Sequence, residues 1–136
     1  MDQRSIGRGG VEPATGGTAV AGDAPAVQVE HLDLEAISEQ VRVRASASSA
    51  GRAARTLHHG QLFRQTLLAL RADASLAEHD NPGEATLHLL SGRVRLTTAS
   101  TAVTGEQGSL LLIPAEPHAL HAITDAVAVL TTALRR

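Results

Sequence analysis

The stretch EHDNPGEATLHLLSGRVRL, residues 78–96, contains the turns and the alternation that decide the fold. The Asn-Pro-Gly tripeptide at 81–83 predicts a turn, because proline fixes one backbone dihedral and glycine tolerates left-handed conformations. The segments EATLHLL and RVRLTT that follow each predict a short strand, and we expect them to form a hairpin across the Ser-Gly turn at 91–92. In the second strand Val94 and Leu96 share one face, while arginines and a threonine share the other.

The same pattern of short apolar segments and turns continues on both sides of this stretch. RAARTLHH and LFRQTLLAL predict two strands around Gly60. Downstream, SLLLIP, HALHAI and AVAVLTTAL predict three more, the last one after a turn at 124–125. About eight short strands at this spacing are typical of a β-sandwich or a small barrel. We therefore expect residues 52–136 to form one all-β domain.

The residues before this domain have a different pattern. Residues 1–27 are rich in Gly, Ala, Thr and Pro with no sustained period, so we expect a disordered tail. Residues 28–51 are expected to hold a short helix and a linker. In residues 33–43 apolar side chains recur at helical spacing, and Asp33 can cap the helix start. The apolar stripe of this helix would pack against the barrel or against a second subunit.

Composition excludes several classes of function. The chain has 136 residues, 43% of them hydrophobic, which suits one domain with a sizeable core. Phe63 is its single aromatic residue, so aliphatic side chains must fill that core. The absence of cysteine excludes disulfides, thiolate metal sites and thiol nucleophiles. A net charge of −2 without a basic block argues against nucleic acid as a partner. The chain also lacks a membrane-spanning apolar run and a secretory signal, so we expect a cytoplasmic protein.

The turns and strand spacing of residues 53–134 resemble those of the cupin family, small jelly-roll barrels recognised by two motifs. The first motif runs Gly, five residues, His-x-His, three or four residues, Glu, six residues, Gly. Gly92 matches its closing glycine, and counting back places His79 at the first histidine. Asn81 stands at the second histidine and Ala85 at the glutamate.

The second cupin motif runs Gly, five residues, Pro-x-Gly, two residues, His, three residues, Asn. Gly108 and Pro114 match it with the expected spacing, whereas Glu116 replaces the glycine. His118 falls one residue short of the histidine position, and Ala122 replaces the asparagine. The chain is thus similar to small single-domain bacterial cupins, RmlC-like jelly rolls, with degenerate metal-binding motifs. The resemblance implies an all-β jelly-roll barrel with a short N-terminal helix and a disordered tail.

The resemblance also implies a site. Metal-bearing cupins hold one divalent transition metal (Fe, Mn, Ni, Cu or Zn) with three histidines and a carboxylate. Here His79 and His118 are the expected metal ligands. Glu84 would be the third if a bulge in the preceding turn shifted the strand register. Asn81 is an expected pocket residue, because an amide orients ligands better than it binds such metals. Gln65 is either a second pocket group or a residue of the strand face.

Strand parity separates the other histidines from this site. His121 lies at an odd offset from His118, which places it on the opposite face of an extended strand. His88 has the parity of the exterior face. His58 and His59 are adjacent, so at most one of them can reach the mouth of the pocket.

Three functions fit these observations. The first is binding of a small molecule in the barrel, with or without one divalent transition metal. The second is a metal-dependent enzyme of the dioxygenase or isomerase type. The third is a dimeric structural or regulatory module without catalysis. We expect a homodimer in any case, because SLLLIP and AVAVL leave apolar residues on both strand faces.

Overall fold

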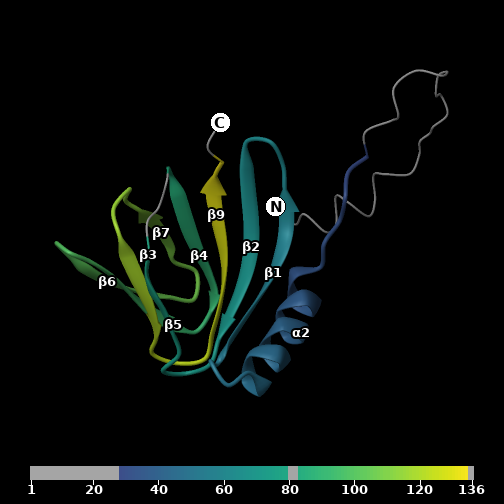
Figure 1. Cartoon of the computed structure of the whole chain (residues 1–136). Coiled ribbons are helices and arrows are strands. Elements are labelled where there is room, and N and C mark those ends of the chain that lie inside the picture. The colour runs from purple at the N-terminus through teal and green to yellow at the C-terminus, as the bar shows by residue number, and fades with distance from the viewer. Residues whose placement is uncertain (1–27, 80–82, 135–136) are drawn as a thin grey trace. The chain divides into compact units, whose positions relative to one another are not determined.

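A computed structural model describes residues 28–79 and 83–134 (Figure 1). The expectations for residues 1–27 and for Asn81 concern residues outside these ranges. No helix in the described part of the chain is long and apolar enough to cross a membrane. The described elements are α2 (Leu34–Ala47), β1 (Arg52–His59), β2 (Phe63–Leu70), β3 (Ser75–His79), β4 (Ala85–Ser91), β5 (Arg93–Thr98), β6 (Ala102–Glu106), β7 (Leu110–Ile113), β8 (His118–Ala122) and β9 (Ala126–Ala133).

The strands form two antiparallel sheets. The five-stranded sheet has the order β1-β2-β9-β4-β7, and the four-stranded sheet has the order β3-β8-β5-β6. From β3 onward the chain passes repeatedly from one sheet to the other, so most neighbours in a sheet are distant in sequence. Figure 1 shows the two sheets facing each other. This is a jelly roll, and it confirms the all-β fold class expected from the sequence.

The core lies between the two sheets and is built from alternate strand residues. On β4, Leu87 and Leu89 are 1% and 0% exposed. On β5, Val94 and Leu96 are buried while Arg93 and Arg95 are exposed. Because side chains alternate across a strand, each of these strands presents one apolar face to the opposite sheet. The core cluster contains aliphatic side chains only, as the composition predicted.

The predicted hairpin between the segments around Gly92 is wrong. β4 pairs with β7 and β9, and β5 pairs with β6 and β8, so the two segments lie in different sheets. Gly92 has a φ of 83°, a left-handed conformation that favours glycine. It therefore makes a corner that carries the chain from one sheet to the other. A glycine turn between two alternating segments has the same local pattern in a hairpin and in such a corner.

Two strands were not anticipated from the sequence. β3, with the sequence SLAEH, and β6, with the sequence AVTGE, are short and contain few large apolar residues. Each of them is an edge strand with a single partner, β8 for β3 and β5 for β6. Their pairing depends on these neighbours more than on their own composition.

The helix α2 begins where the sequence predicted and ends later. The carboxylate of Asp33 accepts hydrogen bonds from the N–H groups of Glu35 (3.1 Å) and Ala36 (3.2 Å), which confirms the expected cap. The helix continues to Ala47, four residues past the predicted end and into the predicted linker. Arg71 donates to the carbonyls of Ser46 and Ser48 at 3.0 and 3.2 Å. These two bonds satisfy carbonyls that the end of a helix leaves without intrahelical partners.

The outer face of the five-stranded sheet is also apolar, and residues 38–47 of α2 cover part of it. Val41 and Ala45 of the helix are 0% and 2% exposed. Arg44 donates to the carbonyl of Ala54 on β1 at 3.3 Å, so this part of the helix contacts the sheet. The apolar run of β9 is therefore covered within the same chain and does not require a second subunit. The buried residues with outward parity on β2 and β9 are Leu67, Ala69, Val127 and Val129.

Candidate functional site

A cavity lies between the two sheets. Its volume is about 30 Å³, and it is partly open to solvent. Both sheets contribute to its wall, and seven of the eight lining side chains are aliphatic. The eighth is a histidine, the only lining residue in the described part of the chain with a polar side chain. The lining residues are Leu68, Leu76, Leu87, Leu96, Ile113, Leu120, Leu130 and His118.

His118 is held in this wall by the turn that precedes β8. It is 6% exposed, and its Nδ1 lies 3.1 Å from the carbonyl oxygen of Glu116. A carbonyl only accepts hydrogen bonds, so Nδ1 must carry the proton and donate it. In the neutral ring the lone pair then lies on Nε2. The N–H of Glu116 donates to the carbonyl of Pro114 at 2.8 Å, which shapes the turn around this contact.

The structure brings the backbones of the two expected metal ligands together. His79 is the last residue of β3 and is the register partner of His118 on β8. The β3–β8 ladder is irregular between Leu76 and His79, which marks a bulge or a similar distortion. Residues far apart in the sequence thus become direct neighbours on adjoining strands.

The other expected site residues lie away from the cavity or outside the described ranges. Ala85, at the position of the motif glutamate, is 7% exposed and belongs to the core. The neighbouring Glu84 is exposed, and its backbone carbonyl accepts the N–H of Ala133 at 2.9 Å. Gln65 donates from Nε2 to Oγ1 of Thr131 at 3.1 Å. It has the opposite parity to Leu68, which lines the cavity, so it lies on the outer face of β2.

The described residues do not supply a complete metal centre. No group of three or more His, Asp or Glu side chains among them is arranged to hold an ion. The described lining residues include one imidazole, whereas transition-metal sites of this kind use three or four protein ligands. No carboxylate lines the described part of the wall beside His118.

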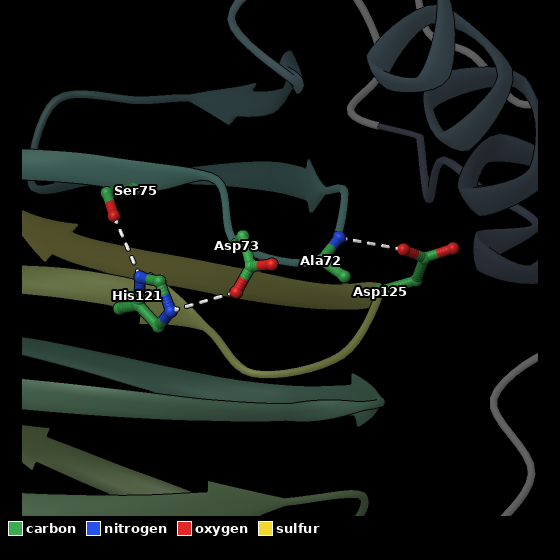
Figure 2. Close-up of polar contacts among 5 residues, drawn as sticks. All are labelled: Ala72, Asp73, Ser75, His121 and Asp125. Carbon is green, nitrogen blue, oxygen red and sulfur yellow. Dashed lines mark hydrogen bonds and ion pairs between the residues drawn. The ribbon is translucent and has the colours of Figure 1, made fainter.

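A second histidine forms a polar cluster on the outer side of the four-stranded sheet (Figure 2). Nδ1 of His121 lies 3.0 Å from Oγ of Ser75, and Nε2 lies 3.5 Å from a carboxylate oxygen of Asp73. The side chains of His121 and Asp73 are 45% and 88% exposed, so this is a solvated contact and not a pocket. His121 is therefore exterior, as its parity indicated.

The contacts of this outer cluster connect the start of β3 to β8. Asp73 has a φ of 72°, and its N–H donates to the carbonyl of Ala122 at 2.8 Å. Nearby, a carboxylate oxygen of Asp125 accepts the N–H of Ala72 at 2.8 Å. Aspartate is one of the few residues besides glycine that tolerate a left-handed conformation. We conclude that the cluster has a structural role.

The remaining described histidines on the strands are also outside the cavity. His88 is exposed on β4, between Leu87 and Leu89, which face the core. The ring of His58 packs against Phe63 with centroids 4.9 Å apart. His59 is exposed at the end of β1.

Sequence reasoning missed two features of the cavity. Leu76 lies on β3, a strand that was not predicted, and it lines the wall. The carbonyl of Glu116 orients His118, although Glu116 was considered only as a departure from the motif. The first feature could have been found from the alternation of Ala74 and Leu76 with Asp73 and Ser75. The second depends on the shape of the turn.

Comparisons with known proteins agree on the fold. No family model and no curated protein matches the sequence. Among solved structures, a cupin superfamily protein from Desulfitobacterium hafniense matches 62% of this chain and 78% of its own, with a TM-score of 0.59 and 16% identity. A conserved protein of unknown function from Streptococcus pyogenes matches 88% of this chain and 99% of its own, with a TM-score of 0.62 and 21% identity.

An enzyme is also among the similar structures. A salicylate 1,2-dioxygenase from Pseudaminobacter salicylatoxidans matches 71% of this chain and 33% of its own, with a TM-score of 0.63 and 16% identity. At these identities the similarity establishes the fold and nothing about ligand or reaction.

Proposed function

We propose that this chain, a small protein with the cupin-type jelly-roll fold, binds a small molecule in the cavity between its sheets, with His118 as the polar contact. The observation that carries the proposal is the oriented imidazole of His118, the one polar side chain among the described lining residues. Small-molecule sites commonly combine an apolar lining with a few fixed polar groups of this kind. Because the described wall holds no carboxylate beside His118, we propose binding and not catalysis.

The space beside His118 supports this proposal. Aliphatic side chains in a closed core interdigitate at nearly the density of an organic crystal. Here the leucines of the two sheets leave empty space that reaches solvent. An apolar ligand would bury the surfaces of these leucines, and each buried methylene would contribute about 0.8 kcal/mol.

Methyl NMR on the full chain tests the proposal. With leucine and isoleucine methyl groups labelled, apolar fragments are expected to shift the signals of cavity residues such as Leu87 and Leu120. Exposed leucines such as Leu112, which is 73% exposed, serve as internal controls. Shifts confined to exposed leucines, or no shifts across a set of apolar fragments, would contradict a binding cavity.

A metal held by His79 and His118 is the second candidate. Two observations favour it: the two residues are register partners, and Nδ1 of His118 contacts a backbone carbonyl. Metal-binding imidazoles commonly donate their other nitrogen in this way, which fixes the ring and its tautomer. Bound metal would polarise an oxygen of the ligand.

Metal analysis of protein purified without a histidine tag tests this second candidate. Each histidine contributes a single nitrogen, so His79→Ala or His118→Ala is expected to remove nearly all bound metal. His121→Ala is the matched control, because its side chain is on the outer face, and it is expected to leave metal content unchanged. If Fe, Mn, Ni, Cu and Zn are each offered and none binds, the metal proposal is wrong.

A further inference from the structure

We infer that the edge of β7 that faces away from β4 is a dimerisation site, at which β7 pairs antiparallel with β7 of a second copy of this chain. The two five-stranded sheets then join into one continuous sheet across a twofold axis. Four properties of β7 lead to this inference: its position at an edge, the direction of its backbone groups, its lack of charge and its exposed leucines. The inference does not depend on the cavity or on a bound ligand.

The backbone of β7 has hydrogen-bonding groups on the side away from β4. Among the described strands, β7 is paired with β4 alone and ends the five-stranded sheet. One step beyond the last register pair of this ladder, Leu89 donates its N–H to the carbonyl of Ser109 at 2.9 Å. Hydrogen-bonded and non-hydrogen-bonded pairs alternate along an antiparallel ladder. Leu111 therefore bonds to β4, whereas the N–H and C=O groups of Leu110 and Leu112 point to the outer edge.

The ladder on the other side of β4 gives the same direction. The N–H of Ala133 on β9 donates to the carbonyl of Glu84, the residue before β4, at 2.9 Å. Successive residues of a strand direct their N–H and C=O groups to opposite sides, so Thr86, two residues further, also bonds to β9. Its register partner on β7 is Leu112. This pair is then a non-hydrogen-bonded one, and the backbone groups of Leu112 point away from β4.

Charge distinguishes β7 from other edge strands. A twofold axis places a strand against itself, so any charges on it meet like charges. β1 has Arg52 and Arg55, and β6 has Glu106. β3 has an irregular register with β8, and such irregularities blunt an edge. β7 has the sequence LLLI, without charge or proline, and its ladder with β4 is regular. It is therefore the described edge that a second copy can approach without repulsion.

The register of the pairing follows from the two residues whose backbone groups point outward. When Leu110 is opposite Leu112 of the partner subunit, the pair exchanges two hydrogen bonds, and the twofold axis generates this pair a second time. Registers shifted by two residues pair only one of these residues within β7. Leu111 then lies on the axis, opposite Leu111 of the partner subunit. The pairing also covers the side chains of Leu110 and Leu112, which are 58% and 73% exposed.

Single cysteines in the full chain test this register, because the chain has no cysteine of its own. Leu111→Cys places two thiols on a non-hydrogen-bonded pair with Cα atoms about 4.5 Å apart, within reach of a disulfide. Leu110→Cys and Leu112→Cys are the matched controls, because each meets its own copy diagonally, at about 7–8 Å, beyond the usual reach of a disulfide. Mild oxidation is expected to cross-link Leu111→Cys at least about tenfold faster than either control. Exposure alone predicts the reverse order, since Leu111 is the least exposed of the three.

A second comparison tests the outward backbone groups. Leu112→Pro removes an N–H that points to the edge and none that bonds to β4, so the variant is expected to fold but to lose the pairing. Leu112→Ile keeps this N–H and an apolar side chain. In light scattering at micromolar concentration, the isoleucine variant is expected to be a dimer and the proline variant a monomer. Circular dichroism checks that both variants fold, and if Leu112→Pro does not, the cysteine variants still decide the matter.

Three results would overturn the inference. A monomeric unmodified chain would show that no second copy occupies the edge. Faster cross-linking of Leu110→Cys or Leu112→Cys than of Leu111→Cys would show that the leucine faces pack without strand pairing. Cross-linking of Leu111→Cys that appears only after removal of residues 1–27 would show that this segment occupies the edge. None of these results bears on the proposed function, which concerns the cavity between the sheets.

Discussion

Replacing Gly92 with alanine tests the corner between the two sheets. A Cβ built on Gly92 would lie 2.1 Å from the carbonyl oxygen of Asp125 and 2.6 Å from Cα of Ala126. Both are backbone atoms where the chain enters β9, so no side-chain rotation can relieve the clash. The matched control is Gly108→Ala. Gly108 has a φ of 90°, similar to the 83° of Gly92, but nothing lies within 4 Å of its Cβ position.

The expected difference in stability between the two variants follows from two separate costs, the left-handed backbone conformation and the clash with neighbouring backbone atoms. Both alanine variants meet the cost of a left-handed conformation, about 1–2 kcal/mol. Both also gain from a less flexible unfolded chain by about 0.4–1 kcal/mol, and this contribution cancels in the comparison. The backbone clash at Gly92 adds about 1–3 kcal/mol, the usual cost of forcing extra atoms into a packed site. We therefore expect the Gly92 variant to be less stable than the Gly108 variant by about 1–3 kcal/mol.

Urea unfolding followed by far-ultraviolet circular dichroism measures this difference, since the chain has no tryptophan or tyrosine for fluorescence. The comparison is valid when both variants unfold with the same dependence on urea. A Gly92 variant that fails to fold under conditions where the Gly108 variant folds would agree with the reasoning. Equal stability of the two variants would show that β9 does not approach Gly92 as described.

The remaining predictions concern the helix, the tail and the association of subunits. Val41→Ala is expected to destabilise the chain by about 2 kcal/mol in urea unfolding, because it removes buried methyl groups and leaves a cavity. Val43→Ala on the same helix, at a position 59% exposed, should change stability by less than about 0.5 kcal/mol. Removal of residues 1–27 is expected to leave the melting temperature unchanged, because their composition offers little to a core; a decrease of many degrees would refute this. A homodimer is still expected, now from β7 alone, where Leu110 and Leu112 are 58% and 73% exposed. Leu112→Arg should then convert a dimer into a monomer by light scattering, and a monomeric unmodified chain at micromolar concentration would contradict the expectation.

The sequence by itself determined the features that depend on neighbouring residues. The alternation of Val94 and Leu96 with arginines predicted which face of β5 is buried, because side chains alternate along any strand. Asp33 predicted the start of α2, because capping involves only the next three residues. The same parity placed His121 on the exterior without knowledge of its contacts.

The tertiary structure decided the features that depend on distant partners. A period of two residues shows that a strand has two faces, but it does not show which strand lies beside it. For this reason β4 and β5 were expected to pair, although they belong to different sheets. The end of α2 depends on Arg71, which follows β2 and contacts the last carbonyls of the helix. The cavity likewise exists only because strands from both sheets bring their leucines around His118, and no local pattern contains that arrangement.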